Sequence, residues 1–256
     1  MALFQSGNPT LSQKIFDRSI DTTSTEVMTV RGSIGKFGFL MIMVVAGAAY
    51  TWNLYANAKP ETMMTMLWIG LIGGLISAIA ITFKPTLAKY LAPAYGLLEG
   101  FVVGALSAVL NDAFAEKFPS IIPTAVGLTF GVAFAMFLLY NFRIIRPTQR
   151  FKSIIMSSIF GIMLFYAATW ILSMFGVHMA FMSLTNSSPL GIGISIFVTA
   201  IAALSLILDF EMIEVGADSG APKYMEWYGA FGLLVTMIWL YLEILKLLSR
   251  IASSRN

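Results

Sequence analysis

Seven apolar stretches of about twenty residues each fill most of this chain of 256 residues. A helix of about 20 apolar residues is long enough to cross the ~30 Å hydrocarbon core of a bilayer. Charged residues make up 11% of the sequence and apolar residues 58%, whereas soluble domains carry about a quarter charged residues. The sequence therefore predicts an all-α, multi-pass integral membrane protein with seven transmembrane helices.

The predicted spans define the domain organisation. They lie at residues 37–56, 64–83, 91–110, 121–142, 153–177, 190–213 and 229–248. Residues 1–36 are polar and rich in Ser and Thr, so we expect a disordered tail without a cleaved signal peptide. No linker interrupts the remainder of the chain. We therefore expect one membrane domain at residues 37–250 and a short C-terminal tail at 251–256.

The distribution of Lys and Arg predicts the orientation. Eleven of these residues lie in the tail and in the loops that share its side, whereas the opposite internal loops hold only Lys59 and Lys117. Positive charge accumulates on the cytoplasmic side of membrane proteins. We therefore expect a cytoplasmic N-terminus and, in a bacterium, a location in the inner membrane.

The last apolar stretch allows two topologies. If it crosses the bilayer, Lys246 and Arg250 lie on the outer side, against the charge bias. A re-entrant segment would remove this conflict, but it would have to shield its backbone from lipid. No helix-breaking residue follows Gly232 in this stretch, and we therefore favour a seventh crossing helix.

Glycines recur at intervals of four residues in three of the predicted spans. Such spacing places them on one face of a helix, where a neighbouring backbone can approach closely. We expect close helix packing at three sets: Gly70 and Gly74; Gly96, Gly100 and Gly104; Gly127 and Gly131.

Among the acidic residues within the predicted spans, three stand out: Glu99, Asp209 and Glu243. A carboxylate at membrane depth is costly, so each is a candidate functional residue. Glu99 has no basic residue within four positions, whereas Lys246 follows Glu243 by three positions and can form an ion pair with it. For Asp209 the alternative role is that of an acid at the level of the lipid headgroups.

Several classes of function are excluded by missing residues. The chain contains no Cys and one His, His178, which we expect in a solvated outer loop. Thiol catalysis and a dedicated Cys- or His-based metal site are therefore excluded. The motifs HExxH and GxSxG are absent, and we expect neither an enzyme nor a bound cofactor. The net charge of +3 is too small to indicate nucleic acid as a partner.

Five segments together carry a resemblance to a known family. They are Leu98 to Gly104 (LEGFVVG), Pro119 to Ala125 (PSIIPTA), the basic loop from Arg143 to Arg150, Asp209 near the end of the sixth span, and Leu-Tyr-Leu-Glu ending at Glu243. Their order and spacing resemble the Bax inhibitor-1/YccA-like family, also called the transmembrane Bax inhibitor motif family. The resemblance covers about residues 35–250.

The resemblance implies a bundle in which the last helix is central. It also implies a pH-sensitive Ca²⁺ leak governed by a pair of acids, here Asp209 and Glu243, with Glu99 in support. Bacterial members are similar to a modulator of a membrane-bound AAA protease, and eukaryotic members suppress cell death from the endoplasmic reticulum. None is an established enzyme. A regulatory protein that binds such a protease is therefore our alternative function.

The physical basis of such a switch would be a proton shared by two neighbouring carboxylates. Lys84 is a candidate latch, that is, a basic residue that would pair with Asp209. Ca²⁺ would bind to the carboxylate oxygens. However, the predicted span ends leave the two acids about 15 Å apart in depth, at 1.5 Å per residue. We expect Asp209 and Glu243 to meet only if the last helix begins near Lys223 or Tyr224.

Overall fold

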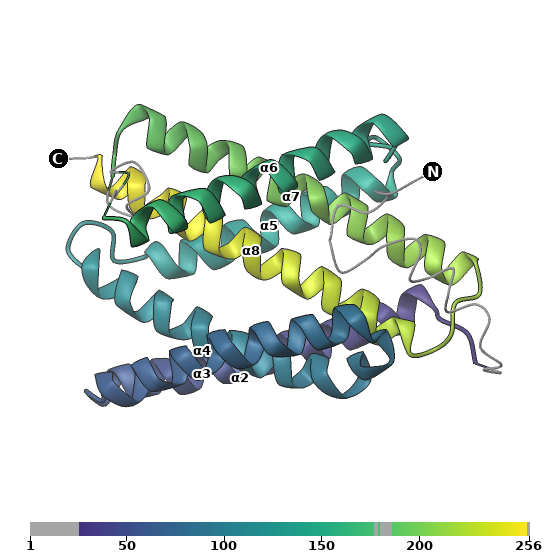
Figure 1. Ribbon diagram of the computed structural model, residues 1–256, viewed down its shortest axis with the longest axis horizontal. Helices are drawn as coiled ribbons and strands as arrows, with labels where there is room; N and C mark the ends of the chain where they lie inside the picture. The colour runs from purple at the N-terminus through teal and green to yellow at the C-terminus, as the bar shows by residue number, and fades with distance from the viewer. Residues whose placement is uncertain (1–25, 177–178, 180–185, 255–256) are drawn as a thin grey trace.

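A computed structural model describes residues 26–176, 179 and 186–254 of the chain (Figure 1). Within these ranges there are seven helices long and apolar enough to span a membrane, which confirms the predicted all-α polytopic fold. They are α2 (Val30–Ala56), α3 (Pro60–Phe83), α4 (Ala88–Ala113), α5 (Ile121–Asn141), α6 (Gln149–Met174), α7 (Pro189–Asp218) and α8 (Met225–Ser253), with a short 3₁₀ helix η1 (Pro85–Leu87) before α4.

Five of the seven helices, α2, α3, α4, α7 and α8, include the whole apolar stretch that predicts them and extend beyond it. Thr29 caps α2, because its hydroxyl accepts a 3.0 Å hydrogen bond from the N–H of Gly32. The helix therefore begins at Val30, within the segment expected to be a polar tail. The last helix, α8, runs without a break for 29 residues and crosses the bundle, as favoured over the re-entrant alternative.

The bundle consists of two groups of helices on either side of α8. Helices α2, α3 and α4 pack together in one group, and α7 packs against α5 and α6 in the other. Figure 1 shows α8, in yellow, running between the two groups, and it contacts α2, α4, α5 and α7. Twenty of its 29 residues are buried, more than in any other helix, so the predicted central position of the last helix is confirmed.

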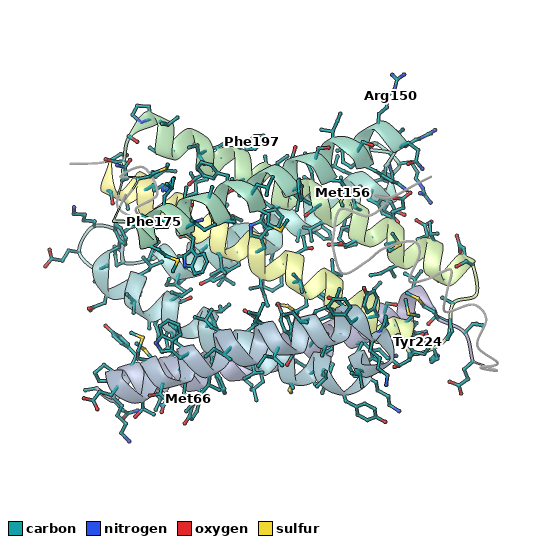
Figure 2. All side chains as sticks on the ribbon, viewed as in Figure 1. Met66, Arg150, Met156, Phe175, Phe197 and Tyr224 are labelled. Carbon is teal, nitrogen blue, oxygen red and sulfur yellow. The ribbon has the colours of Figure 1, made fainter. Side chains whose placement is uncertain are left out.

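We use the terms N-side end and C-side end for the two ends of the bundle. The N-side end is the one at which α2 begins, and it also contains the end of α7 and the start of α8. The C-side end is the one at which α8 ends. Large apolar side chains cover the flanks between the ends, including Phe197 with an exposed fraction of 53% (Figure 2). Arg150 projects outward at the N-side end in the same view. Such an apolar surface suits a lipid environment.

The glycine spacing predicts close packing correctly in α3 and α4 but not in α5. Gly100 of α4 faces Gly47 of α2, and a Cβ atom on Gly100 would overlap the carbonyl oxygen of Val44. By contrast, a Cβ atom on Gly127 or Gly131 would have no neighbour within 4 Å. This prediction is wrong for α5, because the face that carries both glycines is exposed on the outside of the bundle.

Candidate functional site

Asp209 is the most deeply enclosed of the three predicted acids. Its side chain lies on α7 with an exposed fraction of 0%. The residue is nine positions before Asp218, where α7 ends, and therefore about 14 Å from the N-side end of its helix. The structure thus locates Asp209 in the interior of the helix bundle, enclosed by neighbouring helices.

Glu243 forms a polar cluster between α8 and α6. Its Oε1 atom accepts hydrogen bonds from Lys246 Nζ at 2.8 Å and from the Tyr166 hydroxyl at 3.3 Å. Lys246 also donates to the Tyr166 oxygen at 3.1 Å and lies 5.0 Å from the centre of the tyrosine ring. The other carboxylate oxygen, Oε2, is buried and has no hydrogen-bond partner in the described structure. Lys246 is thus the ion-pair partner of Glu243.

Asp209 and Glu243 lie at different depths in the bundle. The last helix does begin where a meeting of the two acids requires, at Met225, but α7 also extends further than its apolar stretch, to Asp218. Glu243 is 18 positions past Met225, whereas Asp209 is nine positions before Asp218. The difference of nine positions corresponds to about 14 Å at 1.5 Å per residue. The geometry therefore gives two separate buried carboxylates.

Glu99 faces α3 across a notch left by a glycine. A Cβ atom on Gly74 would lie 2.8 Å from Glu99 Oε1, so the missing side chain of Gly74 makes room for the carboxylate. Glu99 is half-buried, and no ion pair in the described part of the chain involves it. Glu99 therefore lies at the α3–α4 contact, apart from the cluster of Glu243 with α6.

The predicted latch residue, Lys84, is not paired with Asp209. It caps the C-terminal end of α3, its side chain is exposed, and the described residues provide no ion-pair partner for it. The other single candidate, His178, lies outside the described residues. Within the described ranges there is also no group of three or more His, Cys, Asp or Glu residues that could hold a metal ion.

Sequence reasoning missed a buried carboxylate at the N-side end, Glu226. It accepts hydrogen bonds from the Thr29 N–H and hydroxyl at 2.9 and 2.8 Å and forms an ion pair with Lys36. Lys223 Nζ lies 3.5 Å away. The exposed fraction of Glu226 is 0%. Its partners on α2 are more than 180 positions away in the chain, so no local pattern could have predicted the cluster.

Two further acids on α7 pair with the basic segment that joins α5 to α6. The Glu214 carboxylate accepts hydrogen bonds from Arg143 Nη2 at 2.6 Å and from the Tyr140 hydroxyl. The hydrogen bond to this carboxylate raises the pKa of the Arg143 guanidinium, which therefore stays charged. Glu211 pairs with Lys152 of α6 at 2.8 Å. The basic loop thus anchors the N-side end of α7.

Comparison with known proteins places this geometry in a family. The sequence model of the Bax inhibitor 1 like family matches residues 8–253, nearly the whole chain. No curated protein and no solved structure matches the chain. The family is not known for enzymatic activity. The match agrees with the seven membrane-spanning helices and with the central position of the last helix. The chain therefore belongs to the Bax inhibitor 1 like family of multi-pass membrane proteins.

Proposed function

We propose that this protein is a passive, pH-sensitive cation leak that conducts Ca²⁺. The observation that carries the proposal is the complete burial of Asp209 at membrane depth in a member of this family. A carboxylate is kept in such a position at a cost in free energy, and intramembrane acids are typical of ion pathways. Carboxylate oxygens are also the ligands that Ca²⁺ prefers.

The cluster of Glu243, Lys246 and Tyr166 supplies the pH-sensitive contact in this proposal. Among the described residues, α6 packs extensively only against α7, so the bonds from Tyr166 to Glu243 and Lys246 are its principal polar link to α8. Protonation of Glu243 removes its charge and weakens the ion pair with Lys246. We expect α6 then to separate from α8, so that cation flux increases as the pH falls.

Flux measurements on liposomes loaded with a calcium-sensitive dye test this function. Glu243→Gln imitates the protonated state and should raise the Ca²⁺ flux at neutral pH and reduce its pH dependence. Asp209→Asn should lower the flux at every pH, and Glu99→Gln should lower it less, because Glu99 lies at the α3–α4 contact. The exposed loop residue Glu116 provides a matched control in Glu116→Gln. Flux that responds neither to pH nor to the first two substitutions contradicts the proposal.

A second candidate is a regulatory protein that binds a membrane-bound AAA protease or another integral membrane protein. The observation that favours it is the attachment of the tail to the segment immediately before the central helix. Lys223 N–H donates to the Glu26 carbonyl at 3.0 Å, and Met28 N–H donates to the Ala221 carbonyl at 2.6 Å. A partner that pulled on the tail would therefore act on the start of α8.

Deletion of residues 1–25 separates the two functions. It removes the segment before Glu26 and keeps the backbone contacts with Ala221 and Lys223. A regulatory role predicts normal Ca²⁺ flux together with altered substrate turnover by the partner protease. Unchanged turnover would argue against this role. The orientation that both functions assume, with the N-side end in the cytoplasm, is supported by the concentration of Lys and Arg at that end.

A further inference from the structure

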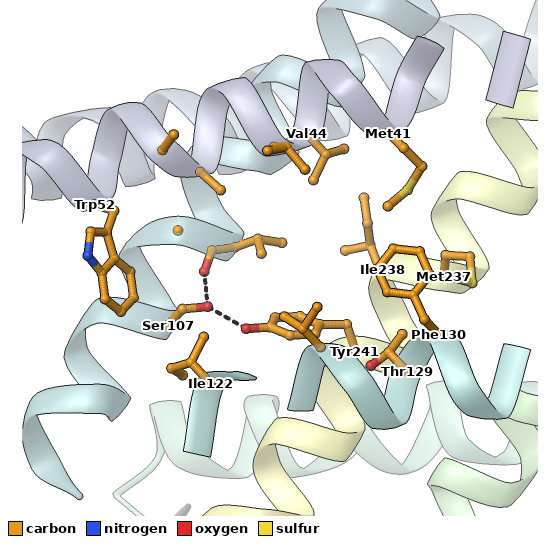
Figure 3. A pocket seen from close by; sticks show the side chains of 16 residues that line it. Met41, Val44, Trp52, Ser107, Ile122, Thr129, Phe130, Met237, Ile238 and Tyr241 are labelled. Atoms are coloured by element: carbon orange, nitrogen blue, oxygen red, sulfur yellow. Dashed lines mark hydrogen bonds between the residues drawn. The ribbon is translucent and has the colours of Figure 1, made fainter. Parts of the chain in front are cut away.

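A cavity of about 350 Å³ lies between α2, α4, α5 and α8. Figure 3 shows its lining side chains, with Met41, Val44 and Trp52 on α2 facing Tyr241 and Ile238 on α8. Neither Asp209 nor Glu243 lines it. We call this space the α2–α5 cleft. It is more than twice the size of the ~150 Å³ apolar cavity that suffices to bind benzene.

The walls of the α2–α5 cleft present hydrocarbon almost exclusively. Its hydroxyl groups are already bonded within the protein: Ser107 Oγ lies 2.6 Å from the Val103 carbonyl and 2.7 Å from the Tyr241 hydroxyl. Thr129 likewise donates to the Ala125 carbonyl at 2.7 Å. None of the lining residues is charged. An apolar space of this kind excludes water and ions and favours an apolar occupant.

The cleft is long, narrow and open toward the lipid. Its lining on α2 extends from Met41 to Trp52, eleven positions or about 16 Å along the helix. Divided by this length, the volume of 350 Å³ gives a mean cross-sectional area of about 21 Å². This area has room for one hydrocarbon chain. On its two rims, Val45 of α2 and Phe130 of α5 have exposed fractions of 61% and 50%, and α2 and α5 do not pack extensively against each other.

The position of the cleft along α2 defines the leaflet that can supply its occupant. Trp52 is four positions before the end of the helix at Ala56, about 6 Å from the C-side end. Met41 is eleven positions after Val30, about 16 Å from the N-side end. The cleft thus begins near the C-side surface and ends in the interior of the membrane.

We propose that the α2–α5 cleft binds one acyl chain of a bilayer phospholipid from the C-side leaflet. The headgroup would lie beyond Trp52, and the methyl end of the chain would lie beside Met41. The bilayer that surrounds α2 and α5 offers this chemistry at the open side of the cleft, which is why we assign the chain to a phospholipid and not to a free fatty acid. The proposal is independent of the cation leak.

Retention of lipid by the purified protein tests occupancy. Native mass spectrometry after mild delipidation should find one phospholipid bound per wild-type chain. Ala49 lines the cleft and is exposed, so Ala49→Phe should fill the space without displacing packed atoms and should abolish retention. Ala46 is exposed on the same helix but does not line the cleft, and Ala46→Phe should retain the lipid.

A second pair of variants tests the wall of the cleft that α5 provides. Val126→Phe, at an exposed lining position, should also abolish retention, whereas Leu128→Phe, exposed but outside the cleft, should not. Equal retention by the cleft-filling and control variants would overturn the proposal, as would retention of a free fatty acid in place of a phospholipid.

Fluorescence of a variant that keeps Trp52 as its single tryptophan tests the orientation of the chain. Bromine atoms on an acyl chain quench tryptophan on contact. Phospholipids brominated near the headgroup should quench Trp52 more strongly than those brominated near the methyl end, and Ala49→Phe should reduce this quenching while Ala46→Phe leaves it unchanged. Stronger quenching by bromines at the methyl end would overturn the assigned orientation.

Discussion

The hydroxyl of Thr29 donates a 2.8 Å hydrogen bond to the carboxylate of Glu226, which joins the N-terminus of α2 to the first turn of α8. The same carboxylate pairs with Lys36, two turns further along α2. A Cβ atom on Gly32 would overlap the carboxylate, so only glycine fits at that position. The negative charge also lies at the N-terminus of a helix, where it is stabilised.

We expect Glu226→Gln to destabilise the bundle by about 2–3 kcal/mol, because it removes a buried, charge-assisted set of hydrogen bonds. The measurement is an unfolding transition of the purified protein in detergent. Lys223→Met is the matched control. Its ammonium group is 3.5 Å from Glu226 and its side chain is 45% exposed, so its loss should cost less than about 1 kcal/mol. Equal stability of the two variants would contradict this account.

The close contact of α2 with α4 predicts that Gly100→Ala costs about 1–3 kcal/mol, since the added methyl group forces the two backbones apart. Gly127→Ala introduces the same group on α5 where nothing lies within 4 Å. Because alanine favours helix more than glycine does, that variant should be as stable as the wild type or slightly more stable. Thermal unfolding of both variants checks the prediction, which fails if the order is reversed.

The pair of Glu243 and Lys246 predicts a non-additive response to substitution. Lys246→Met leaves a buried carboxylate without its cation and should destabilise the protein by about 3–5 kcal/mol. The double variant Glu243→Gln/Lys246→Met removes both charges and should recover most of that loss. A double-mutant cycle on unfolding free energies measures the coupling, and strictly additive effects would show that the pair contributes little.

The hydrogen bond between Ser107 and Tyr241 is expected to contribute a smaller amount. Tyr241→Phe removes the phenolic oxygen, but Ser107 Oγ remains beside the Val103 carbonyl. No buried donor loses its acceptor, so the expected cost is about 1 kcal/mol. Phe at this position keeps the ring, so retention of phospholipid in the α2–α5 cleft should be unchanged. A loss above that of Glu226→Gln would contradict the expectation.

The apolar stretches predicted the number and type of helices because hydropathy and length determine which segments can cross a bilayer. They did not predict where the helices end. Val30 to Lys36 is polar and yet helical, since Thr29 caps the helix and Glu226 binds its first turn. Likewise α7 continues for five residues past Ile213 to Asp218. Because both α7 and α8 extend at this end of the bundle, Asp209 and Glu243 still differ in depth by nine positions.

The candidate site, too, could be predicted from the sequence only in part. The spacing of Glu243 and Lys246 sufficed to anticipate their ion pair, because three positions bring two side chains to one face of a helix. The partner Tyr166 on α6 could not be predicted, because its contact depends on how α6 packs. The glycine pairs of α4 and α5 have identical spacing and opposite surroundings. Spacing defines a face of a helix but not what that face meets.

The position of α8 has a consequence for biogenesis. Of the seven helices it is the last in chain order, and the ribosome therefore delivers it after the six that surround it. Until it arrives, the two outer groups lack the element that both contact, and their inward faces must be covered by lipid or by the insertion machinery. We therefore expect the final packing of the bundle to follow insertion of α8, the helix that joins the two groups.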